Sequence, residues 1–440
     1  MTIPILLLLG TLAWGFRKLF IVPSNLAHIP RVSILSLLWS YISKEPESER
    51  IQRLFLPLAN ESGHPIILVW TFGLWIIHVL DFKIGETALR DRRWVRQLPP
   101  QDLLIWRLVG RSNLAFTIGE TWRKHSKAVT TAFQGPPPIE SIVRSSKELF
   151  TVLGEGGTFK WNDLTLRVTL DILGDAILGH QFKAVLQPHS PFVNGYHDTM
   201  ESFGQLIREK EKKKGPDVIS RMLECEDLTF DDVLDNVSVL FVAGHDTAAG
   251  ALSSLIYYLA KYPTYQNQAR DEAKKVIQNS DTLDQEMLTK MPFGLACVQE
   301  TMRMNNSSNF TLPREADTPM MLGKYHIPPK TMMCFNISGI HHLENTWRDH
   351  NTYNPTRFLS PGSGDDKSSF PIAPFGLGLR QCPARHFAMW ELRGILAMLL
   401  VNYRWRLVEG SIHSEVVQNG FSFGTNLNLP RDLDIVFEKL

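Results

Sequence analysis

One long apolar stretch limits most strongly the folds that this chain can adopt. Residues 229–261 keep a helical pattern of apolar side chains, and Thr229 with Asp232 forms a T-x-x-D capping signal at their start. Pro263 follows the end of the pattern. A helix of roughly thirty residues is about 45 Å long, which is enough to cross a whole domain. The sequence therefore predicts a large helical body built around this helix.

The centre of the helix carries residues that a purely structural helix does not need. Ala243-Gly244-His245-Asp246-Thr247 places a glycine and polar side chains within an apolar pattern. The glycine alone costs a helix about 1 kcal/mol relative to alanine. The segment is therefore a candidate functional site, although Thr247 taken alone is better explained as a residue whose hydroxyl bonds to its own helix backbone.

Shorter patterns elsewhere indicate the fold class. The chain has no obvious linker, so they predict a single domain that is mainly α with a smaller β region near the N-terminal side. The expected elements are two strands in residues 66–80 joined by a turn near Thr71–Gly73, an amphipathic helix over 164–178, a helix from Pro292 through Arg303, strand-like segments in 325–340, and a helix from Pro383 to about Leu400.

The first 22 residues predict a membrane anchor, and residues 23–440 the functional domain. Residues 3–16 are apolar and uncharged, Arg17 and Lys18 follow, and an apolar stretch resumes up to Val22. A bilayer span needs about 20 apolar residues, and the two basic residues suit the cytosolic interface. The alternative is a cleaved signal peptide, but the segment lacks a basic start and a convincing small-residue cleavage site.

Charge and cysteine content exclude other classes. The formal net charge is +1, so we expect no nucleic-acid partner. The basic run at residues 208–214 is explained by a solvated surface, with a lipid or partner contact as the alternative. Four cysteines in 440 residues do not form a disulfide scaffold, so we expect reduced thiols. At least one cysteine is therefore free for other chemistry.

The strongest motif is the loop from Phe375 to Ala384, with the sequence FGLGLRQCPA. Its two glycines allow a tight loop that can approach a flat ligand closely. We expect Cys382 at the start of a helix with Pro383 as its first residue, where the helix N-terminus favours thiolate. A thiolate that ligates haem iron promotes O–O cleavage. The alternatives are a small buried side chain, or zinc bound with His386.

This loop resembles the cysteine-ligand signature of the cytochrome P-450 family, and further segments resemble that family in the same order. The resemblance runs from about Leu19 to the end of the chain and implies the cytochrome P-450 fold. The matching segments are residues 119–127 (a haem-propionate helix), 243–247 (the oxygen-activating segment), 300–303 (the E-x-x-R pair), 313–316 (a propionate-contacting strand) and 354–358 (the element that follows).

The resemblance also implies a role for each matching residue. Cys382 would ligate the iron of haem b (iron protoporphyrin IX). The other implied roles are proton delivery by Asp246 and Thr247, space for dioxygen at Gly244, propionate contacts from Trp122, Arg314 and Arg380, shielding of the thiolate by Phe375, and a structural triad of Glu300, Arg303 and Arg357.

The propionate-binding helix departs from the family pattern at one position. The arginine expected four residues after Trp122 is Ser126, so that contact is missing or supplied by a neighbour such as His125. A basic cluster could face an acidic electron donor, and an ordinary solvated surface explains it equally well. Its members are Arg123, Lys124, Lys127 and Arg385.

The resemblance implies a haem-dependent monooxygenase of the fungal microsomal type, which inserts one oxygen atom from O2 into a small apolar organic substrate. Its electrons would come from NADPH through a separate NADPH–cytochrome reductase, because this chain has no flavin or nicotinamide fingerprint. It would be a monomer, held in the endoplasmic reticulum membrane by a single pass, with the catalytic domain in the cytosol.

Two further departures concern the substrate pocket. The spacing between Trp122 and Ala243 is shorter than usual in the family, and the shortening falls near residues 196–210, where two helices would roof the pocket. Residues 304–310 (MNNSSNF) replace an apolar, proline-bearing turn. The alternative function is therefore a haem-binding relative that lacks turnover because its pocket is truncated. The shortening could also come from faulty gene prediction, and an iron–thiolate isomerase is disfavoured by Asp246 and Thr247.

Overall fold

The computed structural model describes Gly15 and residues 20–71, 73–100, 102–189, 196–278, 282–359, 371–421 and 426–440. The expected anchor at residues 1–22 lies almost wholly outside the described residues. The α-helices are α2 (Ile34–Ile42), α3 (Glu47–Arg50), α4 (Leu56–Ser62), α5 (Phe82–Arg90), α6 (Ile105–Val109), α7 (Gly119–Ala132), α8 (Ile139–Leu153), α9 (Trp161–Leu173), α11 (Tyr196–Lys212), α12 (Val218–Met222), α13 (Phe230–Lys261), α14 (Pro263–Val276), α15 (Gln285–Thr289), α16 (Pro292–Met304), α17 (Ile337–His342) and α18 (Arg385–Asn402).

Short helices and strands complete the fold. The 3₁₀ turns are η1 (Ser24–Leu26), η4 (Pro355–Phe358) and η5 (Gly378–Arg380), and the π turns are η2 (Ile51–Phe55) and η3 (Gly174–Leu178). The strands are β1 (Ile66–Thr71), β2 (Leu74–Val79), β3 (Val95–Arg96), β4 (Gly156–Lys160), β5 (Arg314–Glu315), β6 (Met320–Leu322), β7 (Tyr325–Ile327), β8 (Met332–Phe335), β9 (Tyr403–Leu407) and β10 (Asp434–Lys439).

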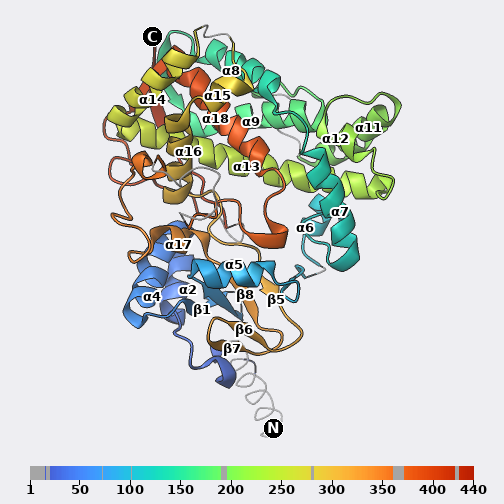
Figure 1. Cartoon of the computed structure of the whole chain (residues 1–440), viewed down its shortest axis with the longest axis vertical. Helices are drawn as coiled ribbons and strands as arrows, with labels where there is room; N and C mark the ends of the chain where they lie inside the picture. The colour runs from blue at the N-terminus through green and yellow to red at the C-terminus, as the bar shows by residue number, and fades with distance from the viewer. Residues whose placement is uncertain are drawn as a thin grey trace, which may run out of the picture.

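The helix α13 is the centre of the molecule, as the sequence predicted. It has 32 residues and begins with a capping box in which Thr229 and Asp232 exchange hydrogen bonds. It crosses the helical part of the molecule, with α8, α9, α16 and α18 around it (Figure 1). Among the described helices it alone has the length and hydropathy of a membrane span, but 67% of that stretch is buried. It is therefore a core helix.

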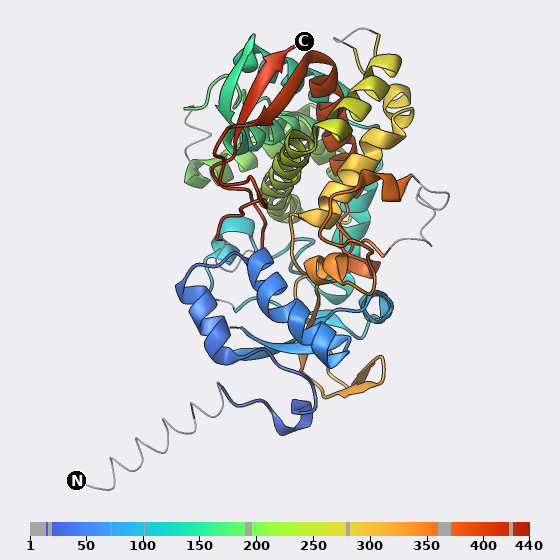
Figure 2. The ribbon, with the colours of Figure 1, turned by 90° about the vertical axis from the view of Figure 1, so that its left-hand side faces the viewer.

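The larger sheet lies below α13 and the helices around it (Figure 1), a three-stranded sheet of β4, β10 and β9 lies in the upper part, and the mainly α fold class with a β region is confirmed. The predicted hairpin in residues 66–80 is present as the antiparallel pair β1 and β2. These strands belong to a five-stranded sheet in the order β1-β2-β8-β5-β3, in which β2 and β8 run parallel. Figure 2 shows this sheet and the N-terminal helices as one block beneath the other helices. The sheet thus joins strands from residues 66–96 with strands from residues 314–335.

Two predicted element boundaries were wrong. The strand pattern expected to continue to residue 340 ends at Phe335, because Asn336 caps α17 by accepting a hydrogen bond from the backbone N–H of Gly339. The helix expected from Pro383 begins at Arg385, after a turn at Pro383 and Ala384. Both errors are shifts at the ends of elements whose type was predicted correctly.

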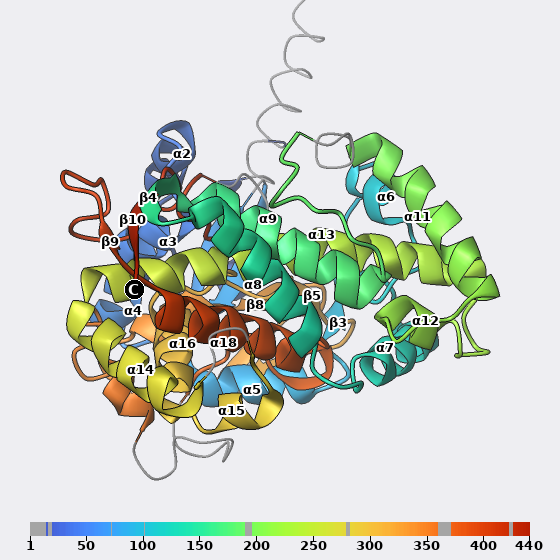
Figure 3. The ribbon, with the colours of Figure 1, turned by 90° about the horizontal axis from the view of Figure 1, so that it is seen from above.

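The region of the expected roof contains helices. α11 occupies residues 196–212, and α12 follows it after a short loop. Both lie beside the N-terminal half of α13 (Figure 3). Phe203 packs against Phe241 of α13 with ring centroids 5.1 Å apart, and Lys210 pairs with Asp217 at 2.7 Å. The segment around residues 196–210 is therefore a packed helix, although it is a single one among the residues described there.

Candidate active site

The cysteine loop is held closed by its own backbone. Gly376 and Gly378 have φ of 69° and 70°, a left-handed conformation that glycine adopts without strain. A Cβ on Gly378 would lie 2.4 Å from the carbonyl oxygen of Leu89 in α5, so only glycine fits against that helix. The N–H of Cys382 donates to the carbonyl oxygen of Phe375 at 3.0 Å. The two-glycine loop predicted from the sequence is therefore present and fixes the position of Cys382.

The state of the Cys382 thiol differs from the prediction. Burial raises its pKa, while a hydrogen bond from the Ala384 backbone and the charge of Arg385 partly lower it. The expected net lowering of this pKa is wrong for the protein alone, because burial outweighs the two effects that lower it. The helix itself starts at Arg385, three residues after Cys382. A bound metal cation deprotonates a coordinating thiol outright. The thiolate expected here therefore depends on the metal that it would bind.

Three arginines converge beside this loop without a counter-ion. They are Arg96 in β3, Arg314 in β5 and Arg380 in η5, and none of them has a carboxylate partner among the described residues. Burial lowers the pKa of Arg96 and Arg314 to about 10 and that of Arg380 to about 9, and repulsion from the other arginines adds to the effect at Arg314 and Arg380. Such a cluster is costly unless an anion binds to it.

The backbone carbonyl groups around the cluster orient the guanidinium groups. Arg380 is also stacked on the ring of Trp122 at 4.1 Å. The hydrogen bonds run from Arg314 Nη1 to the oxygen of Leu89 (3.0 Å), from Arg96 Nη1 to that of Ala115 (2.9 Å), and from Arg380 Nη1 and Nη2 to those of Leu114 (3.1 Å) and Thr117 (2.7 Å).

Several donors in the cluster have no acceptor in the protein. Arg96 Nε, Arg314 Nε and Trp122 Nε1 are buried and have no hydrogen-bond partner among the described residues. Buried donors are nearly always satisfied, so these three indicate an acceptor that the protein does not itself supply. Two carboxylates, such as the propionates of haem, match the charge and the donors. The site therefore fits the cofactor that the sequence suggested.

Arg96 is a site residue that sequence reasoning missed. It lies in a strand of two residues, which is too short to give a periodic pattern. Its position follows from its pairing with Arg314, since the two are direct partners in the β3–β5 ladder. The fold thus places a further arginine beside Arg314, in a chain that has Ser126 where the family's arginine is expected.

His125 does not supply that contact, contrary to the suggestion from the sequence. Its side chain is fully buried, and its Nδ1 lies 2.7 Å from the side-chain nitrogen of Asn236 on α13. Its Nε2 lies 3.3 Å from Ser112 Oγ and 3.7 Å from Asp232. His125 therefore ties α7 to α13 and is not available to a ligand beside Arg380.

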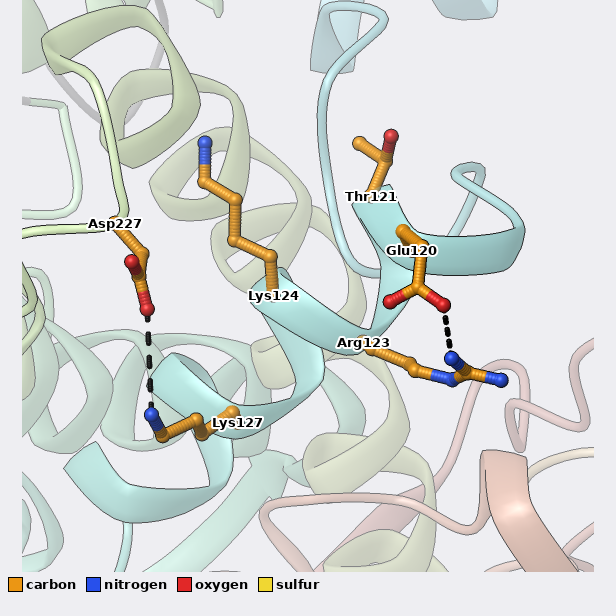
Figure 4. A pocket seen from close by; sticks show the side chains of 6 residues that line it. All are labelled: Glu120, Thr121, Arg123, Lys124, Lys127 and Asp227. Carbon is orange, nitrogen blue, oxygen red and sulfur yellow. Dashed lines mark hydrogen bonds and ion pairs between the residues drawn. The ribbon is translucent and has the colours of Figure 1, made fainter.

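The basic face of α7 is partly neutralised by acidic residues of this chain. Arg123 pairs with Glu120, Lys124 with Asp232 at 2.6 Å, and Lys127 lies 4.0 Å from Asp227. Figure 4 shows Glu120, Arg123, Lys124 and Lys127 on α7 and Asp227 opposite them; with Thr121 these residues line a pocket. The predicted docking of an acidic electron donor on this face therefore remains a prediction.

The centre of α13 is more accessible than the turns on both sides of it. Ala243 is exposed and the next four residues are partly exposed, whereas residues 248–260 are buried. Thr247 Oγ1 donates to the carbonyl oxygen of Ala243 at 2.8 Å, which is the backbone bond considered as the alternative. Asp246 lies 3.1 Å from His245 Nε2. The segment therefore leaves a carboxylate and a hydroxyl partly exposed at the middle of α13.

Gly244 has a packing reason for being glycine. A Cβ there would lie 2.4 Å from Leu173 Cδ1 of α9. The glycine thus allows α9 and α13 to pack closely. The expected space for dioxygen at this position remains a prediction.

The structure brings the three residues of the predicted triad together, with Glu300 and Arg303 fully buried and Arg357 partly exposed. Arg303 donates through Nε and Nη2 to the two carboxylate oxygens of Glu300 at 2.8 and 2.9 Å. Arg357 Nε donates to Glu300 Oε1 at 3.1 Å. The Arg303 and Glu300 side chains are 0% exposed, which rules out an ordinary surface pair. The triad therefore fixes α16 against the segment that carries Arg357.

A family model described as Cytochrome P450 matches residues 191–428, which is more than half of the chain. Among curated relatives, the human cytochrome P-450 4F12 is 30% identical over 213 residues, covering 47% of this chain and 40% of that protein. A human ultra-long-chain fatty acid omega-hydroxylase is 31% identical over 190 residues, covering 42% and 35%. The chain thus spans about two fifths of the length of these relatives.

Solved structures resemble the whole fold. A cytochrome P450DA heme domain superimposes with a TM-score of 0.77 at 18% identity, covering 88% of this chain and 92% of that chain. A retinoic acid-bound cyanobacterial CYP120A1 gives a TM-score of 0.73 at 21% identity, covering 90% and 94%. The fold predicted from the motifs is therefore confirmed.

Proposed function

The chain belongs to the cytochrome P-450 family, and on this premise we propose that it is a haem-dependent monooxygenase. It would insert one oxygen atom from O2 into an apolar organic substrate, with electrons from NADPH. The observation that carries this proposal is the cluster of three arginines beside the Cys382 loop, one buried and two partly buried, which has no carboxylate partner among the described residues. A structural loop needs no such cluster.

The residues around the loop would hold haem b. Cys382 would ligate the iron, and Trp122, Arg96 and Arg314 would bind the propionates through the donors that lack partners. The charge of Arg380 would add to their attraction. Phe375, whose carbonyl accepts the Cys382 N–H, would limit the access of water to the sulfur. Bound haem supplies the activation of dioxygen, while the protein supplies its orientation and electrostatics.

Asp246 and Thr247 would deliver protons to the reaction. Thr247 Oγ1 already donates to Ala243, so it can accept a hydrogen bond from water and turn to pass a proton on. Asp246 is partly exposed and can exchange protons with solvent. The hydroxyl and the carboxylate thus form a relay from the surface to the open centre of α13.

A separate NADPH-dependent reductase at the endoplasmic reticulum membrane would supply the electrons. A single-pass anchor at residues 1–22 would hold the chain there, with residues 23–440 in the cytosol and acting as a monomer. The exposed face of α2 supports membrane contact: Leu35, Trp39 and Ile42 recur on one side of the helix and are 79%, 66% and 73% exposed. α2 lies at the edge of the molecule, which suits such a contact (Figure 3).

The substrate class that we propose is a molecule with a long apolar chain. One of the relatives is named as a hydroxylase of ultra-long-chain fatty acids, and fatty acids are therefore the first substrates to test. Terpenoids and other hydrocarbons are the next group.

The second candidate function is haem binding without turnover. It is favoured by the polar residues 304–310 and by a roof that contains one long helix among the described residues. Both functions predict a shifted Soret band when carbon monoxide binds to the reduced protein. Only the monooxygenase predicts NADPH consumption that depends on substrate when a reductase is present.

Two variants complete the experiment. Cys382→Ser should abolish the thiolate absorption signature, because an alcohol is not deprotonated as a thiol is. Cys225→Ser, at a partly exposed cysteine in a loop, should leave that signature unchanged. Full activity of the Cys382→Ser protein would show that the proposed iron ligand is wrong.

A further inference from the structure

The turn after α16 is polar and buried, in contrast to the apolar turn expected in this family. Asn305, Asn306, Ser307 and Asn309 are between 0% and 9% exposed. Buried polar side chains are costly unless they are hydrogen-bonded. We name residues 305–309 the polar strap. The hydrogen-bond partners of its side chains indicate which parts of the fold it connects.

Paired amides fix the strap to a segment near the C-terminus. The side chains of Asn309 and Asn428 each donate to the other at 2.9 Å. Asn305 and Asn419 form a second reciprocal pair at 3.1 and 2.9 Å. A double amide pair satisfies donor and acceptor together and allows little movement, so the strap has a defined position.

The strap also bonds to α13. Ser307 Oγ donates to the carbonyl oxygen of Thr247 at 2.7 Å, and Asn305 Nδ2 donates to Ser254 Oγ at 2.9 Å. Between these contacts, a Cβ on Gly250 would lie 2.7 Å from the carbonyl oxygen of Asn428 and 3.4 Å from Ser307 Oγ. Glycine at 250 therefore lets the strap lie directly on the helix at the end of the proton-delivery segment.

The neighbouring residue bonds to the cysteine loop. Asn306 Nδ2 donates to the carbonyl oxygen of Pro374 at 3.3 Å, and to that of Ser308 at 2.7 Å. Pro374 immediately precedes Phe375, whose carbonyl accepts the N–H of Cys382. Consecutive residues of the strap thus contact the two sides of the proposed haem site.

We propose that Ser307 and Asn306 are positioning residues that set the separation between Thr247 and the Cys382 loop. Ser307 holds the backbone of Thr247, and Asn306 holds the start of the cysteine loop. A proline, as in the family's usual turn, has no side-chain donor for either contact. This inference rests on the proposed function, because it gives the strap a role in coupling oxygen use to product formation.

The test compares Ser307→Ala with the wild-type holoenzyme and with Ser307→Thr, which keeps a hydroxyl. A hydrogen bond of ordinary strength contributes about 1 kcal/mol, and a change of that size alters the ratio of two competing reactions by about fivefold. We therefore expect Ser307→Ala to raise the ratio of hydrogen peroxide to product by about that factor, and Ser307→Thr to restore it. Ser308→Ala is the matched control, because Ser308 Oγ bonds to Phe310 and Asn426 and not to α13.

A second readout needs no turnover. The infrared stretching band of carbon monoxide on the reduced protein reports on the environment beside Thr247. It should shift in Ser307→Ala and stay in place in Ser308→Ala. Haem should also leave Asn306→Ala faster than wild type when an acceptor globin is added, by about fivefold on the same basis.

The outcomes separate the two proposals. If wild type consumes no NADPH with any substrate, the monooxygenase proposal fails, while the infrared and haem-transfer results still decide the role of the strap. If Ser307→Ala only lowers thermal stability and leaves the infrared band unmoved, the strap is a packing element and the inference is wrong.

Discussion

Two buried charge clusters in this protein contrast in a simple way. The triad of Glu300, Arg303 and Arg357 is closed, because the carboxylate faces two arginines and Arg303 also donates to the carbonyl oxygens of His341 and His350 at 2.8 Å. The cluster of Arg96, Arg314 and Arg380 is open, because it holds three cations, no carboxylate partner among the described residues, and donors without acceptors.

The difference between them teaches how a binding site can be told from a structural one. In the closed cluster each arginine is paired with a carboxylate of the protein, so its contribution is to the folded state. An open cluster lowers the stability of the protein alone and recovers that cost when an anion binds. Arginine is present in both, so the residue type alone does not separate them. The balance of donors and acceptors does.

The largest effect is expected from opening the closed cluster. Glu300→Gln keeps the shape of the side chain but leaves Arg303 and Arg357 without a counter-charge in a buried place. Breaking a buried pair costs about 3–5 kcal/mol, so we expect a loss of that size in the free energy of unfolding, measured with urea.

The matched control for this prediction is Glu286→Gln. Glu286 pairs with Lys290 at 2.6 Å on the surface, where both side chains are more than half exposed. Its loss should change the free energy of unfolding by less than about 1 kcal/mol. Equal effects of the two variants would contradict the distinction between buried and exposed pairs on which the comparison depends.

The next effect is expected from the open cluster. Arg96→Gln removes a cation that repels Arg314 and Arg380, so the haem-free protein should be no less stable than wild type. A hydrogen bond to a charged group contributes about 1.5–3 kcal/mol, so haem should transfer to an acceptor globin at least roughly tenfold faster. A variant that loses stability without haem and binds haem normally would show that Arg96 is structural.

These clusters also show which residues of the site could be predicted from the sequence. Glu300, Arg303 and Arg357 were predictable because a motif and one helix face bring two of them together, and Cys382, Trp122, Arg314 and Arg380 came from motifs in the same way. The long helix was predictable because its apolar pattern continues over 32 residues. Arg96 was not, because its place depends on a strand pairing between distant segments that leaves no local pattern.

The hydrogen-bond partners of individual side chains also could not be predicted from the sequence. His125 was a candidate for the missing propionate contact, yet Asn236 and Ser112 direct its ring toward α13. Those partners are separated from it by 111 and 13 residues. Motifs identify which residues gather, whereas the direction of each side chain depends on packing between elements.

A smaller effect is expected at Thr247, which belongs to neither cluster. Thr247→Ala removes the hydroxyl but no charge, and the backbone bond that it makes to Ala243 is worth about 1 kcal/mol. The Soret band of the carbon monoxide complex should stay as in wild type, while more of the oxygen consumed should appear as peroxide. The measurement is the ratio of peroxide to product, with Thr151→Ala as control, since that exposed threonine makes the same kind of backbone bond on α8.

The smallest and most gradual effect sharpens the comparison with a third buried ionisable group, Glu391 on α18. It is 2% exposed, it has no salt bridge among the described residues, and burial raises its pKa to about 8. The carboxyl therefore stays protonated in the folded state at a pH where the unfolded chain, with a pKa near 4.5, has lost the proton. Folding then binds a proton, so the free energy of unfolding falls as pH rises from about 4.5 to about 8 and is constant beyond that range.

Glu391→Gln should flatten this dependence in urea titrations at several pH values. If the dependence were unchanged in that variant, Glu391 would not be the group that titrates between these pH values, and the comparison would not extend to it.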